Sequence, residues 1–322
     1  MLDLFEPIQK ELEHVENAAI NNLVSDAALV TSIGSYIAKN GGKRLRPALV
    51  LLTSRAFGYT GEKSINLACA VEFIHIATLL HDDVIDGADM RRGSPSANCR
   101  WGNEASILVG DYLFSKSFSI MVNENDNRIM ASLANASMKM AEGEVQQLMS
   151  RYDINLSNES YIDIVTKKTA ELIASCCEVG AIIGGASEEQ IKAMHSYGKN
   201  IGIAFQLIDD TLDFIADRKK LGKPICNDIR EGKITMPLLH VLEAEKNGAR
   251  GKIEDILRKH ELDQDEVGFI MGLVSKHDSI EHTIATAGKY AAMGRENLKS
   301  LPDSPEKNAL SNLSQFIVNR DN

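Results

Sequence analysis

Two aspartate-rich motifs, each at the end of a long apolar segment, constrain this chain more than any other feature. The first is DDVID at 82–86, and the second is DDTLD at 209–213, with the same DDxxD spacing. The segments that lead into them, 67–85 and 188–214, have the composition of helices. Residues i and i+4 of a helix lie on one face, so each motif presents paired carboxylates on one side of its helix.

Carboxylates in this arrangement need a positive partner. Like charges on one helix face repel each other, and both motifs also lie near helix C-termini, where the macrodipole adds about half a negative charge. Oxygen ligands without nearby Cys or clustered His favour Mg²⁺ or Ca²⁺ over zinc. Because Mg²⁺ usually takes one or two carboxylates and completes its shell with water and phosphate, two facing acidic clusters indicate a cleft that binds a diphosphate through metal ions.

Helical periodicity dominates the rest of the 322 residues. No linker, composition break or repeat beyond the two motifs divides the chain, and alternating strand patterns are absent. Ser187 with Gln190 fits a capping box, and Ser304-Pro305 fits an N-cap and a first helical residue. The predicted fold is all-α, a single domain over 1–322 with ten or more helices around a central cleft. The expected helices include 5–19, 67–85, 105–121, 129–149, 161–184, 188–214 and 236–245.

Composition excludes several classes of protein. The net charge of −10 argues against nucleic-acid binding, which requires a basic face. Five cysteines without CxxC spacing indicate reduced thiols in a cytoplasmic protein. Five acidic residues among the first 20 argue against a signal peptide, and no apolar run reaches the roughly 20 residues of a transmembrane segment.

Two basic segments accompany the acidic motifs. The first, GGKRLRP at 41–47, reads most simply as a basic turn between helices, but Lys43 and Arg46 near a helix N-terminus also suit an anion. The second, MRRG at 90–93, directly follows the first acidic motif. Its adjacent arginines are suited to bidentate binding of phosphate, although paired arginines in loops are often only solvated.

Other candidates are weak when taken singly. A lone DDxxD is usually a solvated helix face, and only its repetition after apolar segments gives it weight. His75, two turns before the first motif, is by itself more often a core residue than a ligand. The lysines Lys168, Lys223 and Lys233 would each be surface residues if considered alone.

Together these segments resemble the trans-isoprenyl (polyprenyl) diphosphate synthase family. The resemblance is carried in order by GGKRLRP, LLHDDVIDGADMRRG, KKTAELI, FQLIDDTLDF and LGKPICNDIREGKITMP, and it runs over essentially the whole chain. Flanking segments such as MAEGEVQQLM at 140–149 resemble the octaprenyl diphosphate synthases of that family. The implied fold is the isoprenoid synthase fold.

The resemblance also implies a role for each motif residue. Mg²⁺ would be bound by Asp82, Asp86 and Asp209, supported by Asp83 and Asp213, and Asp210 completes the second catalytic motif. The diphosphate of an allylic substrate would be held by Arg91, Lys168, Thr169, Gln206 and Lys223. Isopentenyl diphosphate would be held by Lys43, Arg46, His75 and Arg92. Lys233 is a further substrate-binding candidate.

The implied reaction is ionisation of the allylic diphosphate, with farnesyl diphosphate as the expected starter, followed by condensation and elimination. Metal ions and cations stabilise the leaving diphosphate, which also serves as the proton acceptor. Small residues at Ala77 and Thr78, one turn before the first motif, imply an open tunnel and an octaprenyl product near C40 for quinone side chains. Met138, Met140 and Leu148 are candidates for the tunnel floor. The resemblance also implies a homodimer.

One position departs from the family, and several alternatives stay open. Cys226 stands where glycine is usual, and it would be strained if that residue requires a positive φ. The same fold could make geranylgeranyl, heptaprenyl or solanesyl diphosphate. A class I terpene cyclase, a non-catalytic regulatory subunit and a calcium-binding structural protein are the remaining alternatives, each less compatible with two complete aspartate motifs and the basic set.

Overall fold

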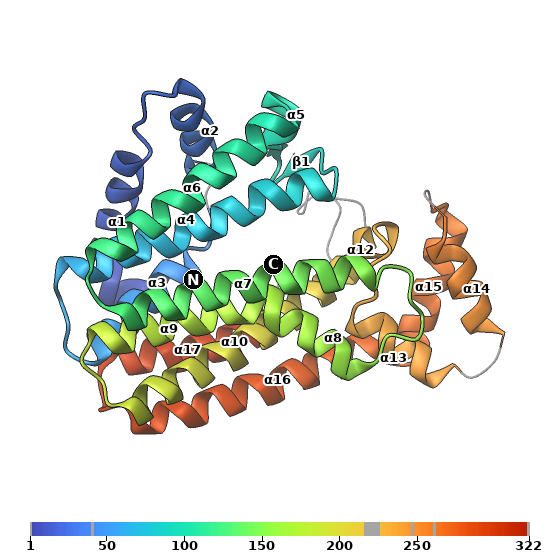
Figure 1. The fold of residues 1–322 in the computed structure, drawn as a ribbon. Coiled ribbons are helices and arrows are strands. Elements are labelled where there is room, and N and C mark those ends of the chain that lie inside the picture. Colours follow the sequence, from blue (N-terminus) through green and yellow to red (C-terminus); the bar gives the residue numbers. More distant parts are fainter. Residues whose placement is uncertain (1, 40–41, 216–225, 246–247, 260–261, 321–322) are drawn as a thin grey trace. The chain divides into compact units, whose positions relative to one another are not determined.

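The computed structural model describes residues 2–39, 42–215, 226–245, 248–259 and 262–320, and these residues are almost entirely helical (Figure 1). More than ten α-helices are present within them, which confirms the all-α prediction. The described chain divides into two compact units. The first comprises residues 1–137, 172–198 and 296–313, and the second comprises 138–171, 199–295 and 314–322.

The first unit is organised around one buried helix. Helix α4 (Glu62–Ile85) packs against α1 (Gln9–Asn22), α3 (Leu45–Ala56) and α6 (Asn103–Asn123). Its residues are apolar on nearly every face, and most of those between Leu67 and Leu80 are buried, as the sequence predicted for a central helix. This unit also contains η1 (Leu2–Ile8), α2 (Ala28–Lys39), α5 (Ala97–Trp101), η3 (Leu298–Ser300) and residues 172–183, which form nearly all of the helix that begins at Glu171.

The second unit is built from shorter helices. These are α8 (Asn158–Val165), α12 (Asn227–Arg230), α13 (Met236–Ala244), α14 (Ala249–Leu257), α15 (Gln264–Lys276) and most of α16 (Ser279–Asn297). Helix α8 continues through a π-helical turn, η2 (Thr166–Ala170), into α9 (Glu171–Ile183). The long helices α7 (Asn127–Met149), α10 (Glu188–Ile215) and α17 (Pro305–Val318) contribute residues to both units.

Local sequence signals account for several helix ends. The Ser187 amide donates to Gln190 Oε1 at 2.9 Å, and the Gln190 amide donates to Ser187 Oγ at 3.3 Å, which is the predicted capping box before α10. Ser304 Oγ accepts from the Lys307 amide at 3.1 Å, and α17 begins at Pro305 as expected. These caps satisfy amides that the first turn of a helix leaves unpaired.

The only strands in the described residues form a short hairpin. Strand β1 (Met90–Arg91) pairs antiparallel with β2 (Ser94–Pro95), and Arg92 (φ 52°) and Gly93 (φ 76°) form the two-residue turn between them. Two consecutive positive φ angles match the twist that hairpins favour. Two-residue strands are too short to leave an alternating pattern, so the sequence did not predict them.

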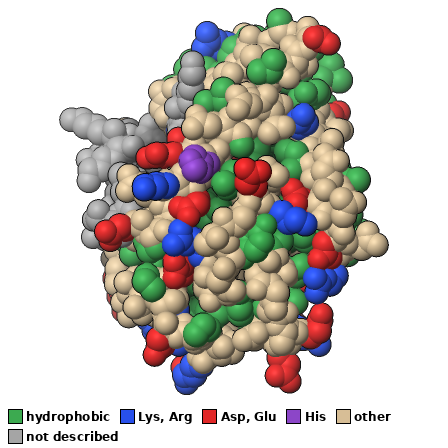
Figure 2. All heavy atoms as spheres, turned by 90° about the vertical axis from the view of Figure 1, so that its left-hand side faces the viewer, with side chains coloured by type: hydrophobic (Ala, Val, Ile, Leu, Met, Phe, Trp, Pro, Cys, Tyr) green, Lys and Arg blue, Asp and Glu red, His purple; other side chains and the backbone are tan. Residues whose placement is uncertain are grey.

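Among the described residues, two helices are long and apolar enough to cross a membrane, judged by length and composition alone. They are α4 and α6, whose most apolar windows are 67% and 33% buried. The sequence-based prediction that no apolar run is long enough therefore underestimated the apolar length of both helices. The buried core helix of a soluble protein meets the same test. On the face shown in Figure 2, acidic and basic side chains are interspersed with hydrophobic ones.

Candidate active site

The first acidic motif occupies the last turn of α4 in the first unit. Asp82 and Asp86 are partly exposed one turn apart, and the Asp86 amide donates to the Asp82 carbonyl at 2.8 Å. Asp83, on another face, is only 3% exposed. The helix therefore presents Asp82 and Asp86 together, as the i, i+4 spacing predicts, and directs Asp83 into the protein.

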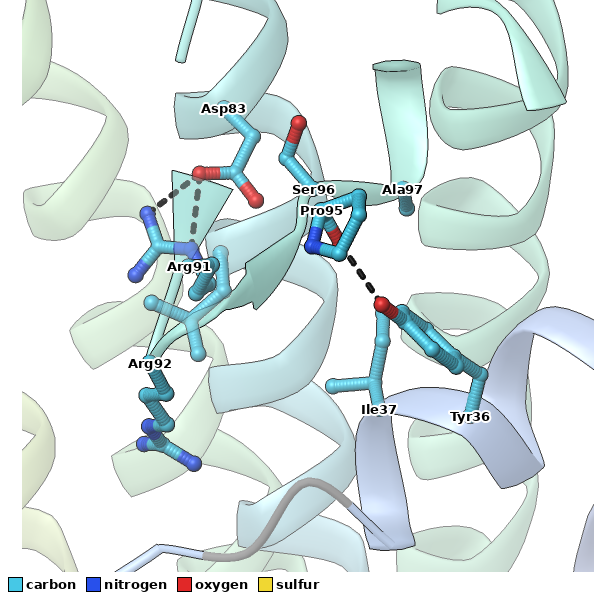
Figure 3. Close-up of a pocket in the computed structure, with 9 residues that line it drawn as sticks. Tyr36, Ile37, Asp83, Arg91, Arg92, Pro95, Ser96 and Ala97 are labelled. Atoms are coloured by element: carbon cyan, nitrogen blue, oxygen red, sulfur yellow. Dashed lines mark hydrogen bonds and ion pairs between the residues drawn. The ribbon is translucent and has the colours of Figure 1, made fainter. Parts of the chain in front are cut away.

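Arg91 holds the buried carboxylate. Its Nε lies 2.7 Å and its Nη2 2.5 Å from Asp83 Oδ1 (Figure 3). Arg91 lies on β1, which begins shortly after α4 ends, so the hairpin positions its guanidinium beside the helix. A small pocket in the same unit is lined by Asp83, Arg91 and Arg92 together with Tyr36, Ile37, Leu79, Pro95, Ser96 and Ala97. Arg91, a predicted phosphate ligand, therefore also anchors the acidic motif.

Arginines gather around His75 in this unit. Burial lowers the pKa of His75 well below its ordinary value, and the charges of Arg46, Arg92, Arg91 and Arg44 lower it further. Burial also lowers the pKa of Arg46 and of Arg92. Positive charges crowd together here, so His75 is neutral and the site favours an anion.

Two features of this basic cluster suit a phosphate. Among the described residues, Arg46 Nε is buried without a hydrogen-bond partner. A Cβ atom at Gly42 would lie 2.8 Å from Arg92 Nη1, so glycine lets the guanidinium approach the backbone before α3. Four predicted ligands of isopentenyl diphosphate belong to this unit, and the structure brings Arg46, His75 and Arg92 together. Lys43 is exposed just before α3.

Arg44 was not singled out from the sequence, although it lies between two predicted ligands. It adopts the left-handed conformation (φ 48°, ψ 29°) at the N-cap of α3. Its guanidinium donates to Glu72 Oε1 at 2.7 Å, Glu16 Oε1 at 3.2 Å and the Ala38 carbonyl at 3.1 Å. Glu72 lies one turn before His75 on α4, so Arg44 ties the basic loop to the helix that carries His75.

The second acidic motif lies near the end of α10 in the second unit. Asp210 is 5% exposed and accepts hydrogen bonds from Tyr161 Oη and, at 2.8 Å, from Gln206 Nε2. Burial and the charge of Asp228 raise the pKa of Asp210 to about 7. Sequence reasoning missed Tyr161, whose hydroxyl comes from α8, 49 residues away along the chain.

Asp213 is held by the start of a short helix. Its carboxylate accepts from the amides of Asn227 and Asp228 at 3.2 and 3.1 Å. Burial and the charge of Asp228 raise its pKa to about 7. Asp228 was also missed as a site residue, although it lies within the CNDIREGK segment that carried the resemblance.

Cys226 has the positive φ at which the sequence predicts strain for any residue other than glycine. This buried residue has φ 59° and ψ 41°, a conformation that glycine adopts without cost, and its amide donates to the Asp213 carbonyl at 3.0 Å. The left-handed turn thus delivers α12 to the acidic motif. Lys223, predicted to bind the allylic diphosphate, lies outside the described residues.

Lys168 and Thr169 lie in the π-helical turn η2. Such turns insert one extra residue and are frequent at functional sites. Lys168 Nζ lies 2.5 Å from Glu144 Oε2 and 2.6 Å from Gln147 Oε1, while Thr169 Oγ1 donates to Gln206 Oε1 at 2.9 Å. Glu144 was not predicted as a partner of Lys168.

A close helix contact and a pocket complete this part of the site. A Cβ atom at Gly143 would lie 2.7 Å from the Lys168 backbone nitrogen, so α7 approaches the π-helical turn only because residue 143 is glycine. One pocket of the second unit is lined by the predicted residues Lys168, Thr169, Gln206, Asp210 and Lys233, with Tyr161 and Asp228. Lys233 Nζ lies 2.5 Å from Glu231 Oε2.

The donors present are compatible with a hard divalent cation. Within the described residues, three or more His, Cys, Asp or Glu side chains nowhere gather as a ready-made metal site. Mg²⁺ does not need such a cage, since it commonly takes one or two carboxylates with water and phosphate. Burial and the charge of Asp228 raise the pKa values of Asp210 and Asp213, so their ionised forms are unfavourable here, and a nearby cation would stabilise them.

Comparisons with known proteins agree with this chemistry. A family model described as polyprenyl synthetase matches residues 27–274. Octaprenyl diphosphate synthase of Escherichia coli (strain K12) is 38% identical over 316 residues, which are 97% of this chain and 96% of that protein.

Solved structures are similar over the same length. A decaprenyl diphosphate synthase from Rhodobacter capsulatus is 38% identical with a TM-score of 0.93, covering 98% of both chains. A polyprenyl synthase from Caulobacter crescentus CB15, in complex with calcium and isoprenyl diphosphate, is 36% identical with a TM-score of 0.95, covering 99% of this chain and 98% of that one. The fold is thus that of the isoprenoid synthases, and the chain belongs to the metal-dependent polyprenyl synthetase family as a trans-type prenyltransferase, a polyprenyl diphosphate synthase.

Proposed function

We propose that the enzyme is an octaprenyl diphosphate synthase that condenses isopentenyl diphosphate onto an allylic diphosphate, with farnesyl diphosphate as starter and Mg²⁺ as the metal. The observation that carries the isopentenyl diphosphate site is the basic cluster around His75. The neutral imidazole offers a hydrogen-bond donor, and Arg46 and Arg92 offer positive charge for one diphosphate, while Arg44 pairs with Glu72.

The allylic diphosphate requires a different set of residues. We assign metal binding to Asp82, Asp86 and Asp209, with Asp83 and Asp213 in support, and Asp210 as the buried member of the second motif. Bound Mg²⁺ would supply electrophilic stabilisation of the leaving diphosphate. Arg91, Lys168, Thr169, Gln206, Lys223 and Lys233 would bind and orient the same group.

The chain's own residues prepare the reaction in three ways. Arg91 pairs with Asp83 and keeps that carboxylate turned inward, on another face of the helix from Asp82 and Asp86. The short helix α12 orients Asp213 through two backbone amides. Neutral His75 would be able to donate a hydrogen bond to a bound diphosphate without adding a fifth positive charge to those of the four arginines around it. Such prior positioning supplies much of the rate.

The octaprenyl length rests on the residues one turn before the first motif and on the 38% identical octaprenyl relative. Ala77 and Thr78 are small, and Thr78 is partly exposed whereas Ala77 is fully buried. Of the floor candidates, Met140 is 8% exposed, while Met138 and Leu148 are 57% and 51% exposed. Met140 is therefore the best candidate, and a quinone side chain is the proposed use of the product. A decaprenyl synthase is equally identical, so another product length is the alternative.

We also propose one synthase domain, assembled as a cytoplasmic, soluble homodimer. Helices α7, α10 and α17 each contribute to both units, which supports one domain. Helix α6 supports the dimer, since only 33% of its most apolar window is buried, and Leu108 and Val122 are 67% and 60% exposed. An uncovered apolar face of this kind is typical of a subunit interface.

The test is product analysis by mass spectrometry with purified protein, farnesyl diphosphate, isopentenyl diphosphate and Mg²⁺, with EDTA as control. A Mg²⁺-dependent ladder that ends near C40 is expected. A shorter or longer endpoint would keep the chemistry and replace the octaprenyl assignment. Folded protein that forms no product from any allylic starter would instead indicate a subunit that needs a catalytic partner.

A further inference from the structure

The last described residue of the chain contacts the second acidic motif. Arg320, two residues beyond the end of α17, forms an ion pair with Asp209. Its guanidinium carbon also lies 4.7 Å from the centre of the Phe205 ring. Phe205 and Asp209 are one turn apart on α10, so Arg320 lies along the helix face that presents the acidic motif.

This arginine is buried but incompletely satisfied. Arg320 is 6% exposed, and burial lowers its pKa. Within the described part of the chain, its Nε and Nη1 atoms are buried without hydrogen-bond partners. A guanidinium has five N–H donors, and leaving donors unpaired away from water is unfavourable. The pairing with Asp209 is therefore a contact that a stronger ligand of Asp209 can displace.

Arg320 and a metal ion require the same carboxylate. Asp209 is 36% exposed at its side chain, so it is accessible to an ion, whereas its partner Arg320 is 3% exposed. A divalent cation on Asp209 would repel the adjacent guanidinium, because both charges are positive and lie in a poorly solvated site. Arg320 must then move away, and with it the C-terminal residues.

We propose that Arg320 is a built-in counter-ion of Asp209 that competes with the metal and fastens the C-terminus until the metal binds. This inference rests on the proposed metal role of Asp209. Without metal, Arg320 compensates the charge of Asp209 and holds the segment 314–320 in place. When a metal ion binds Asp209, it replaces Arg320, and this segment is released. Competition of this kind is reciprocal. Docking of Arg320 lowers the affinity for the metal ion by the same factor by which the bound metal ion lowers the equilibrium constant for docking of Arg320.

The experiment measures Mn²⁺ binding to the substrate-free protein by electron paramagnetic resonance, with Mg²⁺ competition to link the two metals. Arg320→Gln removes the charge and should bind Mn²⁺ about tenfold more tightly than the wild type, since removing a competitor raises affinity. Arg320→Lys keeps the charge and should stay closer to the wild type. Arg258→Gln is the matched control, because Arg258 pairs with Glu254 at 2.9 Å on an exposed helix face of the same unit, and it should leave Mn²⁺ affinity unchanged.

A second readout does not depend on the stability of a variant. Hydrogen exchange of residues 314–320 in the wild-type protein should accelerate when Mn²⁺ is added. Unchanged Mn²⁺ affinity in Arg320→Gln, or slower exchange of the tail on adding metal, would overturn the inference while leaving the synthase function intact. Failure of the wild-type protein to bind Mn²⁺ or Mg²⁺, even with inorganic diphosphate present, would instead overturn the proposed metal role of Asp209 and this inference together.

Discussion

The pair between Arg44 and Glu72 offers the most quantitative test of the basic cluster. Their side chains are 20% and 11% exposed, and Nη1 lies 2.7 Å from Oε1. Removal of one partner from a fully buried ion pair costs about 3–5 kcal/mol, because the remaining charge is left uncompensated. Since a fifth of the Arg44 side chain reaches water and Glu16 also contacts it, we expect Arg44→Met to cost about 2–3 kcal/mol.

Thermal and chemical unfolding measure that cost. For a chain of this size each kcal/mol lowers Tm by about 2–4 °C, so Arg44→Met should melt about 4–12 °C below the wild type. Arg128→Met is the control, since Arg128 is 54% exposed in its pair with Asp126 and should cost less than about 1 kcal/mol. In a double-mutant cycle with Glu72→Met, a coupling energy above about 1 kcal/mol is expected.

The same variant also tests the positioning role. Arg44 caps α3, which carries Arg46, and pairs with Glu72 of α4, which carries His75, so its loss should raise KM for isopentenyl diphosphate about tenfold. The KM for the allylic substrate should change little, because Arg44 pairs with Glu16, Glu72 and the Ala38 carbonyl, none of which is assigned to that substrate. A variant that melts within 2 °C of the wild type and keeps both KM values would refute the reasoning.

Three further predictions concern the product, the metal and the strained turn. Thr78→Phe should shorten the product as judged by mass spectrometry, and it is a cleaner test than Ala77→Phe, which overfills a fully buried site at a cost of about 1–3 kcal/mol; an unchanged C40 endpoint would reject the tunnel assignment. Because the pKa values of Asp210 and Asp213 are raised, the folded protein binds protons at these carboxyls more tightly than the unfolded chain does. Their contribution to the stability of the metal-free protein is therefore fully present below about pH 4 and is lost as the pH rises through about 7. Mg²⁺ affinity, measured by calorimetry, should therefore increase by up to about tenfold per pH unit between pH 6 and 7, and a flat profile would contradict the charge assignment. Because residue 226 has a positive φ, Cys226→Gly should be more stable than Cys226→Ala by about 1 kcal/mol in denaturant unfolding, and equal stabilities would show that the turn is unstrained.

Local sequence features predicted much of the fold. Helices at 103–123, 127–149 and 188–215 appear within a few residues of their expected bounds, because apolar periodicity and caps act over short distances. The burial of α4 followed from its apolar composition on every face. The hairpin of β1 and β2 and the π-helical turn η2 were not predictable in the same way, since two-residue strands and one inserted residue leave no periodic signal.

For the site, the spacing of the aspartates and the composition of the basic segments determined which residues carry the chemistry. Asp82 and Asp86 share a face because the helix repeat dictates it. What each carboxylate contacts was decided only by tertiary structure. Tyr161 reaches Asp210, and Arg320 reaches Asp209, through packing between residues far apart in sequence, and such contacts depend on the whole fold rather than on any local pattern. The sequence thus determined the ligand types, and the tertiary structure determined their partners, their burial and hence their charge.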